Sequence, residues 1–263
     1  SQNKYFGDSF TQKSYGGALR MGYMLANYLS QSWAYRLSFD EVTGIRDNAS
    51  RFIKEQKGRS TVSGIGHSIM YDRRDNRIEP TEGYTLSMAN DFAGVGGNVK
   101  YLRTKFGASN FYTVMEDVIW SINGGYGYIQ KIGSTLRILD RFSLGDESLR
   151  GFQTSGVGPR DRVTKDALGG IHFYTISNEV LLPTPMPSEF NVKMAAFVDL
   201  GSTWGTVEPA CDVIDTKKMR GAGGVGLRWK SPLGPIRIDF AHAFRKDKHD
   251  KTQLVHFGFS TRF

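Results

Sequence analysis

Apolar and polar residues alternate with a period of two along most of this chain of 263 residues. Near its end, for example, Ile236, Ile238 and Phe240 alternate with Arg237 and Asp239. Successive side chains of a strand point to opposite faces, so this period predicts strands that each have one apolar face. We expect about eleven strands (10–12), within residues 18–25, 33–40, 64–72, 84–92, 97–106, 118–128, 174–182, 191–200, 221–230, 236–245 and 254–263.

The second face of these strands distinguishes a membrane barrel from a soluble sandwich. In a soluble domain that face is densely charged, whereas here it holds mainly Gly, Ala, Ser, Thr and Asn with single charges, which suits a water-filled lumen. Each segment has close to the ~9–11 residues that a tilted strand needs to cross a bilayer. The pattern therefore predicts an all-β fold, a transmembrane antiparallel β-barrel of the outer-membrane type. Aromatic residues lie toward the predicted strand ends, as the girdles of such barrels require: Trp33, Tyr84, Trp120, Tyr126, Tyr128, Trp204 and Trp229.

The lengths of the predicted connections indicate how the strands are oriented. Outer-membrane barrels have short periplasmic turns and longer external loops, so the C-terminus is expected in the periplasm. On the same parity the chain begins outside, with residues 1–14 as the tail of a loop and with an odd number of strands. Such barrels normally have an even number, which predicts that this chain is the C-terminal part of a longer barrel. The short connections are 231–235 and 183–189, and the long ones are 205–219, 131–166 and 41–60.

Composition and charge argue against some classes of protein but do not identify the function. The mean hydropathy is −0.38 and no run of 18 apolar residues exists, which excludes membrane-spanning helices. The net charge of +8 is spread over loops such as 51–59 and 245–251, so solvated or lipopolysaccharide-facing loops are favoured over nucleic-acid binding. Cys211 is the single cysteine, and it has neither an internal disulfide partner nor metal-ligand spacing.

Motifs that would indicate an enzyme have simpler explanations. Gly221, Gly223 and Gly226 match a dinucleotide-binding pattern, but the following residues continue a strand instead of starting a helix. The cluster of charged residues 72–75 with Asn76 could bind a metal, although a turn before Pro80 and Gly83 is the better interpretation. The five histidines lack ligand spacing, and no G-x-S-x-G motif supports a serine hydrolase. The sequence therefore predicts no catalysis, no cofactor and no metal site.

The longest predicted loop contains the most specific motif, Ser148-Leu149-Arg150-Gly151-Phe152. With the elements around it, this motif makes the chain resemble the BamA-type outer-membrane assembly factors from about Ser14 onward. Their superfamily carries a (V/L)-R-G-(F/Y) element in a loop folded back into the barrel. The other elements occur in the same order and spacing: 71–72 with 75–76, 156–160, Pro183-Thr184-Pro185, 199–204 and 231–235.

The resemblance implies a sixteen-stranded barrel preceded by periplasmic POTRA domains. Residues 1–263 would form its C-terminal portion, from roughly the sixth strand to the last, with residues 131–167 as the loop folded into the lumen. The POTRA domains and the early strands would be absent from this chain.

The function implied is the folding and insertion of β-barrel proteins into the bacterial outer membrane, without nucleotide or cofactor. It would use the seam, the junction between the first and last strands of the barrel. The implied partners are unfolded outer-membrane proteins, outer-membrane lipid and accessory lipoproteins bound through the POTRA domains, but no nucleic acid. Two alternatives stay open: a superfamily transporter that secretes or translocates a polypeptide, and a passive porin-like barrel.

Strand parity and the resemblance select the candidate residues. Glu179 and Asp199 fall on the lumen face of neighbouring strands, and the loop is long enough for Arg150 to reach them. The resemblance places the loop arginine against acids at the same positions, and a planar guanidinium can bridge two carboxylates. Gly151 is expected to let the backbone turn and Phe152 to pack beside it. The alternative for Arg150 is an exposed loop arginine.

The last strand would supply half of the seam. Gly258 is expected to offer a flexible kink there, and Phe263 a terminal aromatic. Phe263 has a second interpretation, as a girdle residue that carries a C-terminal sorting signal.

Overall fold

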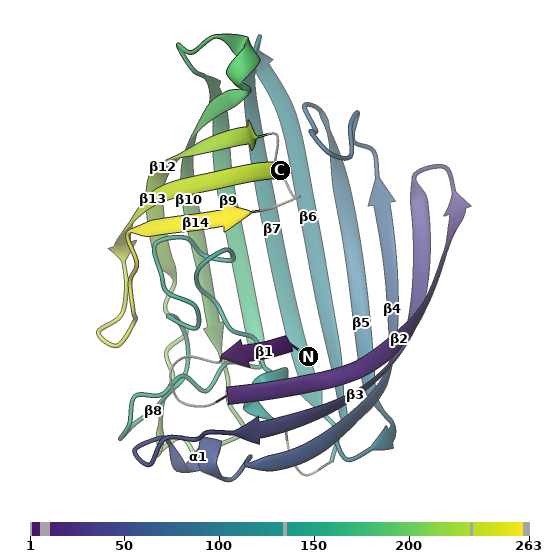
Figure 1. Cartoon of the computed structure of the whole chain (residues 1–263), viewed down its shortest axis with the longest axis vertical. Coiled ribbons are helices and arrows are strands. Elements are labelled where there is room, and N and C mark those ends of the chain that lie inside the picture. Colours follow the sequence, from purple (N-terminus) through teal and green to yellow (C-terminus); the bar gives the residue numbers. More distant parts are fainter. Residues whose placement is uncertain (1, 6–10, 134–135, 232–233, 260–263) are drawn as a thin grey trace.

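A computed structural model describes residues 2–5, 11–133, 136–231 and 234–259. Within these residues the chain forms one antiparallel twelve-stranded sheet, in which strands adjacent along the chain lie side by side (Figure 1). Two short strands, β8 (Arg160–Asp161) and β11 (Val213–Ile214), pair separately. The strands of the large sheet are β1 (Gln2–Tyr5), β2 (Thr11–Ala26), β3 (Leu29–Thr43), β4 (Gly58–Asp72), β5 (Gly83–Gly97), β6 (Tyr101–Met115), β7 (Val118–Lys131), β9 (His172–Pro183), β10 (Val192–Trp204), β12 (Arg220–Ser231), β13 (Gly234–Arg245) and β14 (Val255–Phe259).

The predicted all-β fold is confirmed, but the start of the chain differs from expectation. Residues 1–14 were predicted to be a loop tail, whereas Gln2–Tyr5 form β1 and β2 already begins at Thr11. The described sheet therefore has twelve strands, not an odd number, and its first described residues lie in a strand. The physical reason is that backbone pairing needs no apolar face, so polar residues such as Thr11, Gln12 and Lys13 extend a strand without showing the alternation.

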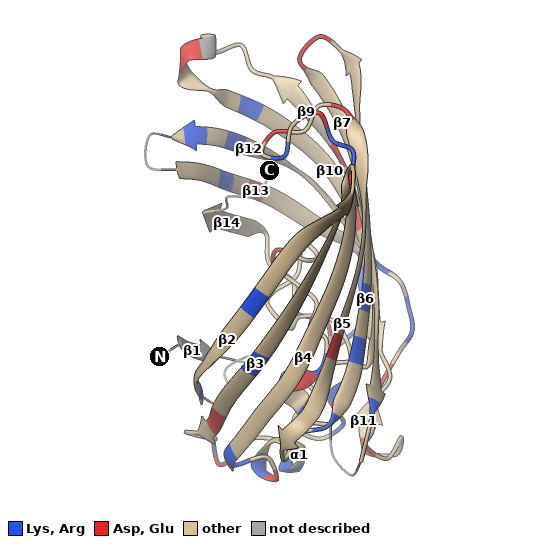
Figure 2. Cartoon of the chain, turned by 90° about the vertical axis from the view of Figure 1, so that its right-hand side faces the viewer, with Lys and Arg blue, Asp and Glu red and all other residues tan. Residues whose placement is uncertain are grey.

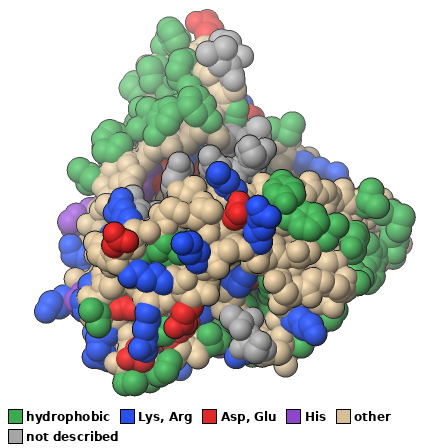
Figure 3. All heavy atoms as spheres, turned by 60° about the horizontal axis from the view of Figure 1, so that its bottom comes forward, with side chains coloured by type: hydrophobic (Ala, Val, Ile, Leu, Met, Phe, Trp, Pro, Cys, Tyr) green, Lys and Arg blue, Asp and Glu red, His purple; other side chains and the backbone are tan. Residues whose placement is uncertain are grey.

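The two faces of the curved sheet have opposite character. On the convex face Leu19 and Phe244 are 77% and 58% exposed, whereas Asp239 and Ala241 on the concave face are 0% and 2% exposed. Charges interrupt the strands only as isolated bands (Figure 2), and hydrophobic side chains gather on the flanks of the molecule (Figure 3). Each exposed Å² of apolar surface costs about 25 cal/mol in water, so the convex face is built for lipid.

The two ends of the sheet also differ. One end has mainly tight turns, such as 27–28 and 116–117, and the other has the long connections 44–57, 132–171 and 205–219 (Figure 1). We call these the turn end and the loop end. No helix among the described residues is long and apolar enough to cross a membrane.

The connections at the loop end pack into a cap with a core of its own. Helix α1 (Arg51–Lys54) contributes Phe52 and Ile53. The Ser50 hydroxyl accepts from the Phe52 amide and donates to Asp161 at 2.6 Å. Burial raises the pKa of Asp161, but this and other hydrogen bonds outweigh that effect and hold the pKa below its usual value. The rest of this core comes from Val42, Ile138, Leu168 and Val213.

The segment 73–82 at the turn end is a turn, as the sequence predicted. The carboxylate of Asp75 accepts from the Thr81 hydroxyl at 2.7 Å and from the amides of Thr81 and Glu82. Asn76 accepts from the amide of Ile78 at 2.8 Å. These contacts occupy the carboxylate and amide oxygens with local donors, which is how Asp and Asn stabilise turns.

This turn is expected to loosen in acid. Burial raises the pKa of Asp75, but hydrogen bonds from Thr81, Glu82 and Asn76 outweigh it and lower the pKa to about 2. A lowered pKa contributes stability that is present above about pH 4, where the carboxyl is ionised even when unfolded, and lost as the pH falls through 2. Amide protection at Thr81 and Glu82 should therefore decrease between pH 4 and pH 2. The same decrease in an Asp75→Asn variant would assign it to another carboxylate.

Candidate functional site

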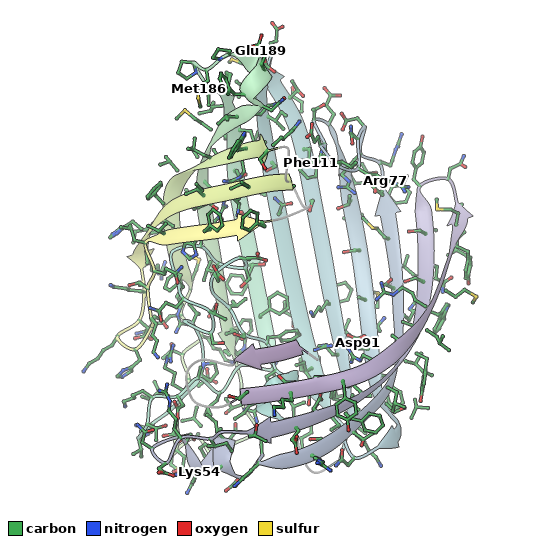
Figure 4. The ribbon with its side chains drawn as sticks, viewed as in Figure 1. Lys54, Arg77, Asp91, Phe111, Met186 and Glu189 are labelled. Atoms are coloured by element: carbon green, nitrogen blue, oxygen red, sulfur yellow. The ribbon has the colours of Figure 1, made fainter. Side chains whose placement is uncertain are left out.

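The candidate site forms where the connection between β7 and β9 folds onto the concave face (Figure 1). Within this connection Phe142 bridges to Gly170 and Leu144 to Val157, so the chain runs out and back as a narrow hairpin. Residues 145–153, which we call the loop tip, lie at its far end. Side chains from the surrounding strands point toward it inside the curve of the sheet (Figure 4). The loop expected inside the barrel thus lies on the concave face of the sheet.

Arg150 of the loop tip contacts both acids that the sequence singled out. Its Nε and Nη2 atoms donate to the two oxygens of Asp199, each at 2.7 Å, and Nη1 donates to Glu179 at 2.5 Å. Nη2 also reaches Ser177 at 3.0 Å. The guanidinium carbon lies 3.4 Å from the centre of the Phe197 ring. Arg150 is 5% exposed, so these contacts replace its hydration almost completely.

These contacts keep Arg150 charged despite its burial. Burial lowers its pKa, but hydrogen bonds and the negative charges of Asp199 and Glu179 outweigh that effect and raise the pKa above its usual value.

The surroundings of Gly151 and Phe152 explain why these two residues follow Arg150 in the motif. Gly151 has φ +86°, and a Cβ there would lie 2.6 Å from the Cβ of Ala222 on β12. Only glycine tolerates both the backbone angle and the approach. Phe152 is fully buried in a small hydrophobic cluster that attaches the tip to the sheet. The other members are Leu144, Leu149, Val157, Ala222 and Ala243.

Three residues that sequence reasoning did not connect to the site extend it along the sheet. Arg228 on β12 donates to Glu179 at 2.8 Å and to Asp239 on β13 at 2.6 Å. Arg237 approaches the other oxygen of Asp239 at 3.1 Å. Strand parity placed these residues on the polar face, but their pairing depends on the register between strands. We call the alternating series Asp199, Arg150, Glu179, Arg228, Asp239 and Arg237 the charge ladder.

Gly226 makes room for the charge ladder. A Cβ on Gly226 would lie 2.1 Å from Oδ1 of Asp239 and 2.8 Å from Nη1 of Arg228. This glycine belonged to the apparent dinucleotide-binding pattern, and the structure shows that it lies inside strand β12. Its role is to leave space for two side chains on the concave face.

The residues predicted for the seam are only partly described. Gly258 lies within β14 opposite Arg237, with no register shift between β13 and β14. A Cβ on Gly258 would lie 3.6 Å from the guanidinium nitrogens of Arg237, so the bare backbone provides the surface on which that guanidinium lies. The flexible kink stays a prediction. Phe263 lies outside the described residues.

A cavity of about 690 Å³ opens beside the ladder toward the turn end. Arg150, Glu179 and Arg228 line one side, and Phe111 of β6 and Glu79 of the turn 73–82 line the other. Phe111 is labelled in Figure 4 at this end of the sheet. Glu79 forms an ion pair with Lys230 of β12, so the turn reaches across to the strands that carry the ladder.

Comparison with known proteins identifies relatives over nearly the whole chain. The model of the Omp85 superfamily domain matches residues 1–263. "Outer membrane protein assembly factor BamA" of Neorickettsia risticii is 34% identical over 255 residues, which are 95% of this chain and 34% of the relative. The chain thus spans about a third of the length of that curated relative.

Two solved structures share the fold. BamA from Haemophilus ducreyi lacking POTRA domains 1–3 matches with a TM-score of 0.79 at 21% identity, over 94% of this chain and 54% of that one. CdiB from Acinetobacter baumannii matches with a TM-score of 0.61 at 16% identity, over 94% of this chain and 41% of that one. At these identities the likeness concerns the barrel architecture.

Arg150→Ala should destabilise the protein strongly, because it removes the arginine that pairs with the buried carboxylate of Asp199 and one of the two arginines that pair with Glu179. We expect a loss of about 3–5 kcal/mol in urea unfolding from lipid vesicles, and a double-mutant cycle with Asp199→Ala should show clear coupling. The matched control is Arg103→Ala, which removes an ion pair with the more exposed Asp91 and should cost about 1 kcal/mol or less. Strictly additive effects of the Arg150 and Asp199 changes would contradict this account of the ladder.

Gly226→Ala should also destabilise the protein, by about 1–3 kcal/mol, because its methyl group would displace Asp239 and Arg228. Gly17→Ala on β2 is the control, since a Cβ at Gly17 meets nothing within 4 Å. The same urea titration should show little change for the control. Equal effects at both positions would assign the loss to backbone propensity instead.

Proposed function

The chain belongs to the Omp85 superfamily, and we propose that it is the C-terminal part of the barrel of a factor that folds and inserts β-barrel proteins into the bacterial outer membrane. The observation that carries the proposal is the loop tip with its Arg-Gly-Phe motif, buried against the charge ladder. The relative named an outer membrane protein assembly factor supports it across 95% of the chain. POTRA domains and early strands would be supplied by the rest of the protein.

The location proposed is the outer membrane. The convex face exposes large apolar side chains along strands β2 to β14, and such a surface is stable only in lipid. The lipid is therefore a partner in its own right. Accessory lipoproteins that bind the POTRA domains would be further partners.

Assembly would proceed at the exposed edge of β14. In the described part of the chain β14 pairs with β13 and with no other strand. The free edge of a strand presents unpaired N–H and C=O groups, and a strand of an unfolded client can add there by backbone hydrogen bonding. Burial of the client's apolar face in lipid then supplies the driving force, so neither nucleotide nor cofactor is needed.

The charge ladder would hold the neighbouring strands rigid during this exchange. It links the loop tip to β9, β10, β12 and β13 through buried ion pairs. A strand that leaves or joins at the edge then moves against a fixed wall. Gly258 and Phe263 are the residues of the last strand proposed to serve the exchange.

A cysteine at Phe259 of β14 should crosslink to client strands in cells, because Phe259 lies near the end of the strand at the free edge. Cys211→Ser provides the background, since Cys211 is an exposed free cysteine. Phe240→Cys is the control, because it lies on the same convex face of β13, which is paired on both sides. Equal crosslinking at both positions would contradict the edge mechanism.

Depletion of the full-length protein separates the three candidate functions. For an assembly factor, the amounts of many folded barrel proteins in the outer membrane should decrease together, as heat-modifiable bands show. For a polypeptide transporter, the amount of one exported passenger should decrease while other barrels stay constant. For a porin, purified protein should show steady single-channel conductance, and depletion should leave both quantities unchanged.

A further inference from the structure

The segment just before β14 pairs with the loop tip. The amide of Gln153 donates to the carbonyl of Lys251, and the amide of Lys251 donates to the carbonyl of Gly156, both at 3.0 Å. Phe152 and Thr252 face each other in an antiparallel bridge. The loop tip thus acts as a short strand beside the entry to the last strand of the chain.

His256 completes this contact from inside β14. It is 1% exposed, and its Nε2 lies 2.9 Å from the amide nitrogen of Gly151, while Nδ1 lies 3.0 Å from a carboxylate oxygen of Asp146. The Gly151 amide can only donate, so Nε2 is the acceptor and Nδ1 carries the proton donated to Asp146. The carbonyl of Gly151 accepts from the amide of Gln253 at 3.0 Å. The amide of Gly151 is therefore bound by His256 of the last strand, and its carbonyl by Gln253 of the segment just before that strand.

We propose that His256 is a positioning residue that clasps the loop-end half of β14 to the loop tip, so that strand exchange at the seam begins from the turn end. The clasp comprises Gly151, Asp146, Gln253 and His256. This inference rests on the proposed function for its consequence in assembly, whereas the clasp itself is a property of the barrel alone.

The clasp has a physical effect that β13 alone cannot provide. A strand paired on one side only is open to fraying from both ends. At the loop end of β14 the clasp adds buried hydrogen bonds, and Gly151 follows directly after Arg150, which the charge ladder fixes. Among the described residues of β14 toward the turn end, Gly258 meets the concave face through Arg237, which lies over it and is 22% exposed in its side chain. The two ends of the described part of β14 are therefore held unequally.

Side-chain chemistry provides the first test. Glutamine can accept from Gly151 and donate to Asp146, as the imidazole does, whereas leucine can do neither. In hydrogen exchange of the full-length protein, His256→Leu should speed exchange of residues 251–257 by about tenfold and leave residues 236–240 of β13 near wild type. His256→Gln should restore most of the protection. Equal loss in both variants, or none in either, would overturn the clasp.

A disulfide provides the second test, and its arm with His256 intact does not depend on the folding of a His256 variant. Gln153 and Lys251 are exposed and joined by a backbone hydrogen bond, so cysteines at both positions, in the Cys211→Ser background, would tie the tip to the strand. With His256 intact, oxidation should leave client assembly unchanged, because the contact persists throughout the cycle. With His256→Leu, oxidation should restore the lost protection and reduction should remove it again.

The outcomes separate the two proposals. Loss of client assembly on oxidation with His256 intact would show that the tip must release, and the inference would be wrong. Unchanged exchange in His256→Leu would also overturn it, whatever happens to assembly. If exchange responds as expected but no client depends on the protein, the clasp stands and the proposed function is wrong.

Discussion

A buried guanidinium needs neutralisation, and the arrangement of one wall of this sheet follows from that need. Arg150 enters the concave face on a loop, and the strands beneath it supply the carboxylates of Asp199 and Glu179. Glu179 is shared with Arg228, which in turn requires Asp239, which is also close to Arg237. The ladder then contains three arginines and three carboxylates, so its charges balance.

Such a network of buried ion pairs contributes more to the correct placement of the loop than to the free energy of unfolding. Buried ion pairs repay their desolvation only with good geometry, and an apolar replacement is often as stable, but removal of one partner leaves an uncompensated charge. The ladder thus penalises any placement of the loop in which Arg150 misses its acids. Gly151 and Gly226 are also needed for this placement, because a single methyl group at either position would enter occupied space. The large charged side chains can meet on the concave face only because small residues beside them leave room.

Some of these features could be predicted from the sequence, and others could not. Period-two alternation revealed the strands and their faces, because a face directed to lipid must be apolar at every second residue. The contact of Arg150 with Glu179 and Asp199 was predictable from parity together with the family resemblance. Arg228 and Asp239 were visible on the polar face, but their pairing depends on a register that alternation does not encode. β1 was missed because its residues pair through the backbone, and His256 because its partner Gly151 lies 105 residues away in sequence.

As a consequence, the two ends of β14 in the described part of the chain are attached to the concave wall with different strength. One half of β14 is joined through His256 and Gly151 to the residue that anchors the ladder, so displacing that half would disturb buried charges several strands away. The other half meets the concave wall through Arg237 lying over a glycine, a contact that can be lost without uncovering a fully buried ion. A strand opens first where local unfolding costs the least free energy. In the strand exchange proposed above, the edge of β14 would therefore open from the turn end, while the loop end would keep the register of the strand.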